Sequence, residues 1–95
     1  MSDVPYFHVA EIKATHDDLV AIRAALAALI PPTLKEEGCL AFDIRESDEK
    51  EGHFILWEAW TTKEALNRHF EEPHTSAYMA KGWTELVSLT ELKSL

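Results

Sequence analysis

Apolar and polar residues alternate along several stretches of the chain, with the two-residue period of a half-buried β-strand. In one of them Leu40, Phe42 and Ile44 fall on one face, while Asp43 and Arg45 fall on the other. The stretch from 53 to 60 is apolar on both faces, which is typical of a strand inside a sheet. The pattern therefore predicts strands over residues 6–13, 39–45, 53–60 and 85–92.

The segment between the first two predicted strands has helical spacing instead. Its apolar stripe, with steps of three and four, comprises Leu19, Ile22, Leu26 and Leu29. Thr15 and Asp18 resemble a capping box, with Asp in place of the usual Glu, and predict where the helix starts. Pro31 and Pro32 lack the N–H that a helix interior needs, so we expect a kink or a new turn there. Gly38 is expected to take the left-handed conformation that ends such a segment.

A second helical segment follows the third predicted strand. Thr61 and Glu64 have capping-box spacing, and we expect the helix to reach about Glu72. Pro73 breaks it, and a further helical turn or two closes at Gly82. The resulting order, β-α-β-β-α-β, is the ferredoxin-like plan of the α+β class, in which both helices cover one face of an antiparallel sheet.

The 95 residues fit a single domain, residues 1–95. The sheet face away from the helices would carry Ile55, Trp57 and Ala59. Because a large apolar face in contact with water usually marks an interface, we expect a homodimer that packs sheet against sheet.

The charge of the chain excludes some partners. Its net charge is −8, from 17 acidic and 9 basic residues, which repels nucleic acid and anionic membranes. No apolar run approaches the roughly 20 residues of a membrane-spanning helix. Residues 1–5 lack the basic and apolar regions of a secretory signal, and the single Cys39 cannot form an internal disulfide. We therefore expect a cytoplasmic protein.

Glu58 departs most clearly from the apolar pattern. It shares a strand face with Phe54, Leu56 and Trp60. A buried carboxylate is costly unless it gains a partner. Glu58 therefore either lies in a pocket, where it orients a histidine or accepts a proton, or leans toward water and pairs with Lys63 or Arg68.

Two histidines on the second helical segment are candidate proton-transfer groups. His69 borders the apolar side of its helix, and an imidazole pKa of roughly 6.5 suits a general base near neutral pH. His74 follows Pro73 at a helix start, where it can face a cleft or cap the turn. We predict that Glu58, His69 and His74 are the catalytic residues, with packing or capping as the alternative for each histidine.

Further side chains are candidates for the same pocket. The candidate substrate-binding residues are His8, Phe42, Trp60 and Tyr78, with packing in the core as their alternative role. Cys39 is a possible nucleophile, but a lone cysteine entering a strand is more often a small buried apolar residue. We expect no metal, because His53, Glu58, His69 and His74 lack the spacing of ligand pairs on one helix. We expect no nucleotide or flavin cofactor, because no glycine-rich loop is present.

These residues together resemble the antibiotic biosynthesis monooxygenase family, whose members are small dimeric α+β barrels. The resemblance covers nearly the whole chain. It is most specific at residues 34–39 (LKEEGC), 40–43 (LAFD) and 57–60 (WEAW), and at His69, Pro73-His74 and Ala77-Tyr78. The chain is similar to the quinol monooxygenase branch and, about as closely, to the branch that isomerises the phosphorylated autoinducer-2 sugar. Glu58, His69 and His74 match the family's motif positions.

The resemblance implies an enzyme, a cofactor-independent monooxygenase acting on a small quinol or phenol. A base would remove a proton, and the electron-rich anion would itself reduce dioxygen. Two alternatives stay open: an isomerase or lyase of a small oxygenated sugar or lactone, and a ligand-binding or regulatory dimer without turnover. Heme-degrading relatives use an asparagine on the first strand, and a tryptophan and a histidine on the second helix. The corresponding places here are Ile12, His69 and Met79, which argues against heme degradation.

Overall fold

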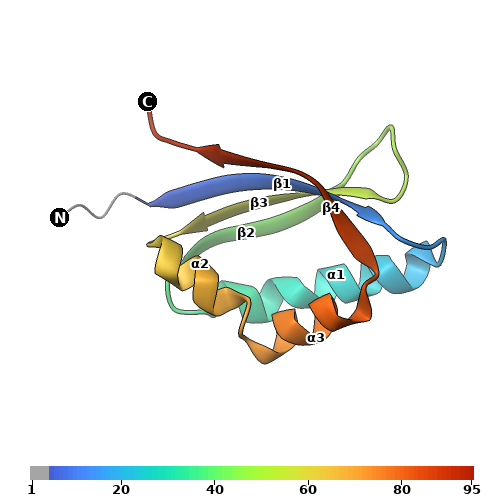
Figure 1. Cartoon of the computed structure of the whole chain (residues 1–95), viewed down its shortest axis with the longest axis horizontal. Coiled ribbons are helices and arrows are strands. Elements are labelled where there is room, and N and C mark those ends of the chain that lie inside the picture. The colour runs from blue at the N-terminus through green and yellow to red at the C-terminus, as the bar shows by residue number, and fades with distance from the viewer. Residues whose placement is uncertain (1–4) are drawn as a thin grey trace.

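Figure 1 shows the computed structural model of the chain, which describes residues 5–95. Residues 1–4, which carry most of the N-terminal pattern considered above for a secretory signal, lie outside the described residues. None of the described helices is long and apolar enough to cross a membrane. In chain order the elements are β1 Tyr6–Ala14, α1 Leu19–Leu34, β2 Cys39–Glu46, β3 His53–Trp60, α2 Lys63–His69, α3 Pro73–Lys81 and β4 Thr84–Leu92.

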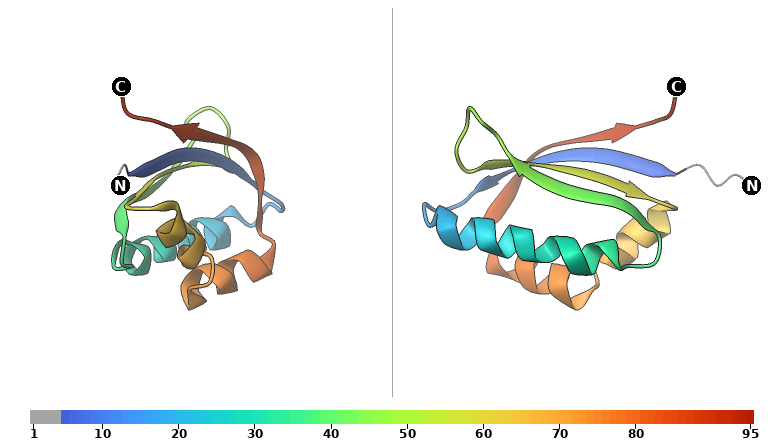
Figure 2. Two further views of the ribbon diagram at one scale, coloured as in Figure 1. Left: turned by 60° about the vertical axis from the view of Figure 1, so that its left-hand side comes forward. Right: turned by 180° about the vertical axis from the view of Figure 1, so that it is seen from behind.

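The four strands form one antiparallel sheet in the order β2-β3-β1-β4. The helices α1, α2 and α3 all lie on the same side of this sheet (Figure 1, Figure 2). The predicted α+β ferredoxin-like plan is therefore confirmed. The second helical segment is divided into α2 and α3, so the full order is β-α-β-β-α-α-β.

The first helix does not start with the predicted capping box. Asp18 is the N-cap, and its carboxylate accepts a hydrogen bond from the backbone N–H of Ala21. The hydroxyl of Thr15 donates instead to the carbonyl oxygen of Gly82, 2.8 Å away. The capping-box prediction is wrong because Thr15 is engaged in tying the end of β1 to the end of α3.

The proline pair does not interrupt α1. The helix continues through Pro31 and Pro32 to Leu34, so no new turn begins at the prolines. Leu29 and Thr33, which flank the pair, are both buried against the rest of the protein. Packing on either side of the prolines therefore holds one continuous helix despite the missing backbone donors.

The start of β2 contains an irregularity that the sequence pattern does not reveal. The pairing of β2 with β3 shifts register between Cys39 and Ala41. Leu40, which we expected on the same face as Phe42, is 53% exposed, whereas Phe42 is only 5% exposed. Cys39 packs against the core in its place. A bulge of this kind changes the direction in which nearby side chains point. The prediction that Leu40 shares a face with Phe42 is therefore wrong.

The two faces of the sheet differ as predicted. Trp60 and Ile22 are completely buried on the side that carries the helices. Trp57, on the opposite face of β3, is 40% exposed and stacks on Phe7 of β1. The outer face of the sheet is covered by none of the described helices (Figure 2).

Candidate active site

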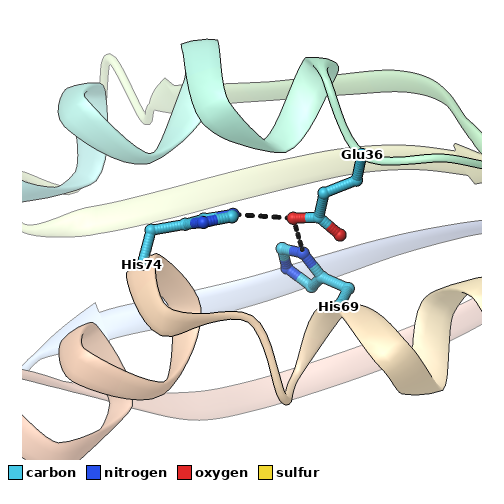
Figure 3. A group of neighbouring side chains, drawn as sticks. All are labelled: Glu36, His69 and His74. Atoms are coloured by element: carbon cyan, nitrogen blue, oxygen red, sulfur yellow. Dashed lines mark hydrogen bonds and ion pairs between the residues drawn. The ribbon is translucent and has the colours of Figure 1, made fainter.

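Glu36, His69 and His74 come together from separate parts of the chain (Figure 3). Oε2 of Glu36 lies 2.8 Å from Nδ1 of His69 and 2.6 Å from Nε2 of His74. The side chains of Glu36 and His69 are buried, whereas that of His74 is 21% exposed. An ionised carboxylate can only accept, so each imidazole N–H donates to this one oxygen. We call these three residues the Glu36–His69–His74 cluster.

The local structure explains how the cluster forms. His69 is the last residue of α2, and His74 is the second residue of α3. Pro73 occupies the first position of α3, where its missing N–H costs nothing. Glu36 lies in the turn after α1, where its backbone N–H bonds to the carbonyl of Thr33. The break between α2 and α3 lets both histidines reach the same carboxylate.

Gly38 holds this turn against α2. Its φ of +90° lies in the left-handed region, as predicted, where residues other than glycine are strained. A Cβ at this position would lie only 2.6 Å from Cβ of Ala65 in α2. The carbonyl of Gly38 also accepts the backbone N–H of Thr61. Gly38 thus fixes how closely the turn that carries Glu36 approaches the helix that carries His69.

His69 lies in the wall of a cavity of about 500 Å³ that is lined by the sheet and the helices. Most of the lining residues are apolar, among them Leu26, Phe42 and Leu66. The aromatic rings of Phe42 and Trp60 lie with their centroids 5.5 Å and 5.0 Å from that of His69. Such surroundings exclude water and strengthen the bond between imidazole and carboxylate.

The bond to Glu36 sets the position of the proton on His69. Nδ1 carries the proton that is donated to Glu36, so in the neutral ring the lone pair is on Nε2. The hydroxyl of Thr75 lies 3.3 Å from Nδ1 and 3.5 Å from this Nε2, near the limit of hydrogen-bond distance. Neutral His69 therefore keeps a nitrogen that can accept a proton, which a general base requires.

Glu58 lines the same cavity, but the histidine that it contacts is His8, and neither His69 nor His74. Among residues 5–95, its Oε2 lies 3.2 Å from Nε2 of His8, and its Oε1 accepts the indole N–H of Trp60 at 3.0 Å. The sheet register explains this pair, because His8 and Glu58 are directly opposite each other on β1 and β3. Glu58 is 4% exposed, so the alternative of a surface ion pair is wrong.

The other predicted substrate-binding residues divide into two groups. The cavity is lined by His8, Phe42 and Tyr78 but not by Trp60. Trp60 is completely buried, and it contributes by holding Glu58. The hydroxyl of Tyr78 shares a hydrogen bond with that of Thr84, and burial raises the pKa of Tyr78. Tyr78 is thus a neutral hydroxyl in the cavity wall at neutral pH.

Cys39 is not activated as a nucleophile. Burial, together with the negative charges of Glu36 and Glu58, raises the pKa of its thiol to about 11. The reactive form of a cysteine is the thiolate, which is scarce at neutral pH for such a group. The alternative given above, a small residue that packs against the core, agrees with its position.

Glu36 is the residue of the cluster that was not predicted from the sequence. The stretch from 34 to 39 stands out, but both Glu36 and Glu37 precede Gly38, and only the folded turn decides which of them faces inward. Glu36 is separated from His69 by 33 residues and from His74 by 38, so no short spacing links them. The left-handed Gly38 beside two acidic residues is the one available signal.

The cluster also offers the donor types of a metal site. Its carboxylate and its two imidazoles place their ligand atoms within 4.8 Å of one another, a set that suits a divalent transition metal. Of the four ligands considered from the sequence, this set keeps His69 and His74. Glu36 takes the place of His53 and Glu58. The hydrogen bonds from both imidazoles to one oxygen satisfy the three groups as they stand. The absence of a bound metal therefore stays a prediction.

Comparisons with known proteins extend this description. The profile of the family "antibiotic biosynthesis monooxygenase" matches residues 5–81. The chain is 35% identical over 77 residues to the Mycobacterium tuberculosis protein named "Putative monooxygenase Rv0793". These residues span 81% of this chain and 75% of that protein. It is also 35% identical over 69 residues to the uncharacterized Bacillus subtilis protein YjcS, and this match spans 73% of the chain and 66% of YjcS.

Solved structures have the same fold. The structure of a protein named YJCS superimposes with a TM-score of 0.88 at 30% identity, over 96% of this chain and 99% of that one. The structure of Rv0793 from Mycobacterium tuberculosis gives a TM-score of 0.81 at 33% identity, over 96% and 95% of the two chains. Because the family profile covers most of its length and relatives of this similarity share its fold, the chain belongs to the antibiotic biosynthesis monooxygenase family.

Proposed function

We propose that this protein is a monooxygenase that oxidises a small quinol or phenol with dioxygen and needs no cofactor. The observation that carries the proposal is the buried hydrogen bond from His69, which lines the apolar cavity, to Glu36 behind it. A carboxylate that fixes one nitrogen of an imidazole leaves the other as a base. Membership of a family named for monooxygenases supports the same reaction class.

In the proposed reaction His69 removes the proton of a substrate hydroxyl through Nε2. Glu36 then faces a positively charged imidazole and stabilises it, as a buried carboxylate does for a catalytic histidine. His74 donates to the same oxygen of Glu36 and helps to hold that carboxylate in place beside His69. The residues of the chain thus supply the base, its orientation and the charge that balances it.

The proposed reaction balances with dioxygen as the only oxidant. The electron-rich anion of the substrate reduces dioxygen, and a C–O bond forms at a ring carbon that carries hydrogen. His69 returns its proton to the outer oxygen of the resulting peroxide. The O–O bond then breaks while the ring carbon loses its hydrogen, so one oxygen atom stays on the ring and the other leaves as water. A quinol would give a hydroxyquinone and one molecule of water.

The cavity suits such a substrate better than a phosphorylated sugar. Its lining is mostly apolar, which favours both an aromatic ring and dioxygen. Lys63 is the only lysine or arginine among its described lining residues, and its side chain is 63% exposed. Glu58, Glu85 and Glu91 also line the cavity and would repel a phosphate. The alternative of a sugar-phosphate isomerase is therefore less well supported by this site.

We also infer that the protein acts as a homodimer. Leu86 and Leu89 of β4 contribute to the cavity wall but remain 61% and 51% exposed in the single chain. The outer face of the sheet presents Phe7 stacked on Trp57. A second copy that covers these surfaces would remove apolar area from water and shield the cavity from solvent.

The proposal is tested by measuring oxygen consumption with a panel of quinols in buffer that contains a metal chelator and no added cofactor. We expect consumption that depends on enzyme concentration and exceeds the spontaneous oxidation of each quinol. Titration with phosphorylated sugars provides the comparison. Saturable binding of a sugar phosphate together with no enzymatic oxygen consumption would favour the isomerase and contradict the proposal.

A further inference from the structure

We infer that the Glu36–His69–His74 cluster binds one zinc ion, and that the bound ion removes the base from the proposed active site. Zinc is here a reversible inhibitor and not a cofactor, so the prediction that the protein carries no resident metal is unchanged. The effect on activity rests on the proposed function of His69, whereas the binding of zinc does not.

The cluster has the ligand types of a zinc site with one open position. One carboxylate and two imidazoles are a set that zinc uses with a water molecule as its fourth ligand. Oε2 of Glu36, Nδ1 of His69 and Nε2 of His74 all lie within 4.8 Å of one another. Figure 3 shows both imidazole rings directed at the same carboxylate. The fold thus gathers the three ligands from separate parts of the chain before an ion arrives.

A zinc ion requires only small movements of these side chains. Zinc bonds of roughly 2.0–2.2 Å place two ligand atoms of a tetrahedral site about 3.3–3.5 Å apart. The two nitrogen–oxygen distances, 2.8 and 2.6 Å, are shorter because a hydrogen bond spans each of them. His74 can adjust, since its side chain is 21% exposed. The same exposure gives ions in solution a route to Glu36 and His69, which are buried.

The charges beside the cluster favour a cation. Glu37 is next to the cluster in the chain, and Glu71 and Glu72 belong to the connection between its two histidines. The chain as a whole has a net charge of −8. Negative charge of this kind raises the local concentration of cations. The two imidazoles then select zinc over magnesium, because magnesium prefers oxygen ligands.

Zinc at Nδ1 of His69 disables the other nitrogen of the ring. A neutral imidazole carries one hydrogen, and a nitrogen that binds a metal through its lone pair cannot keep that hydrogen. The hydrogen that Nδ1 donates to Glu36 must therefore move to Nε2 through solvent when zinc binds. Nε2 then has no lone pair with which to accept a substrate proton. In His74 the hydrogen moves in the opposite sense, from Nε2 to Nδ1, so neither ring gains or loses a proton.

The first test measures zinc binding to metal-free protein by isothermal titration calorimetry. We expect one zinc ion per chain, with an affinity that falls about 100-fold or more in Glu36→Gln and in His74→Ala, each of which removes a ligand. The matched control is His53→Phe, which removes the imidazole 3.0 Å from Glu11 and should bind zinc like the native protein. Magnesium should not compete. No binding to the native protein, or an equal affinity in both folded cluster variants, would overturn the inference.

The second test reads the tautomer of His69 by nitrogen-15 NMR of the imidazole rings. Without zinc the hydrogen should be on Nδ1, and with one equivalent of zinc it should be on Nε2. Zinc binding that leaves this tautomer unchanged would show that His69 is not a ligand and would contradict the inference.

Oxygen consumption then separates this inference from the proposed function. Zinc should abolish consumption with a quinol at concentrations that match its dissociation constant, and a chelator should restore it. Unchanged consumption by zinc-saturated protein would overturn the inhibition and leave the monooxygenase standing. If zinc binds at the cluster and shifts the tautomer but no quinol is oxidised by the metal-free protein, the zinc site stands and the monooxygenase proposal fails. Consumption that requires zinc would contradict both.

Discussion

Glu36 is the residue on which the candidate site depends, because one of its oxygens receives both imidazoles. From the sequence, Glu58, His69 and His74 were the expected catalytic residues. In the structure Glu58 forms an ion pair with His8, whereas His69 forms a hydrogen bond with Glu36. We therefore expect substitutions of His69 and Glu36 to have effects on catalysis that depend on each other.

Replacing His69 with alanine should lower kcat/KM for a quinol by roughly 10²–10⁴-fold, the contribution typical of a general base. Glu36→Gln should lower it in the same direction, because an amide cannot balance the charge on the protonated imidazole. The double variant should lose little more than His69→Ala alone, since residues that act as a unit are not additive. Steady-state kinetics on folded variants measures this. Independent losses that multiply would contradict the assigned pair.

Gly38→Ala should destabilise the protein by about 2–4 kcal/mol, because it combines an unfavourable φ with a steric clash. Its new Cβ would lie 2.6 Å from that of Ala65. Gly82→Ala is the matched control, since Gly82 has a φ of +65° but no atom within 4 Å of such a Cβ. It should cost about 1–2 kcal/mol. Urea unfolding of both variants gives the comparison, and an equal cost would show that the contact with Ala65 is unimportant.

The thiol of Cys39 should react slowly with iodoacetamide in the folded protein at pH 8. Burial and two nearby carboxylates raise its pKa to about 11, so the thiolate becomes abundant only as the pH rises toward that value. Because folding raises this pKa, the folded protein favours the neutral thiol. The resulting contribution to the stability of the fold is present below the pKa of the unfolded cysteine and is lost as the pH rises through the pKa of the folded one. Alkylation followed by mass spectrometry from pH 8 to 11 tests this, with urea-unfolded protein as the reactive control. Equally fast alkylation of folded and unfolded protein at pH 8 would contradict it.

At the scale of the elements, the pattern of residues along the chain predicted those features that depend mainly on residues close together in the sequence. Alternating residues placed the strands, and the inward side of β3 with Glu58 and Trp60 was predicted correctly. The order of elements then led to the sheet, because few topologies satisfy short antiparallel connections. The left-handed Gly38 and Gly82 followed from the conformations that only glycine adopts readily.

Features that depend on contacts between distant segments were not predictable in this way. The register shift that turns Leu40 outward arises from the pairing of β2 with β3. The continuity of α1 through Pro31 and Pro32 depends on packing that outweighs propensity. The choice of Glu36 over Glu58 as the partner of His69 depends on where the turn after α1 meets α2. The residue types thus indicated that a site was present, but only the fold shows which carboxylate pairs with which histidine.

The whole molecule should be a dimer in solution, because a single copy leaves apolar surface of the sheet in water. Light scattering at micromolar concentration should give twice the monomer mass of 10.8 kDa. Trp57→Glu places a charge on the outer face of the sheet and should shift the mass toward the monomer.

The control for this variant is Val20→Glu, which changes a 78% exposed residue of α1 on the other side of the sheet. It should leave the mass unchanged. A native protein that has only the monomer mass would contradict the dimer and would leave Leu86 and Leu89 as an open edge of the cavity.

Whether an oxygen atom from dioxygen enters the product is the most direct test of the proposed chemistry. The measurement is mass spectrometry of the product formed from a quinol under ¹⁸O₂ in ordinary water, with the His69→Ala protein and an enzyme-free blank for spontaneous oxidation. We predict one ¹⁸O atom per molecule of enzymatically formed product, at a rate that falls with His69→Ala. A product without label, or a labelled product formed equally fast by the blank and by His69→Ala, would contradict a monooxygenase that uses His69 as its base.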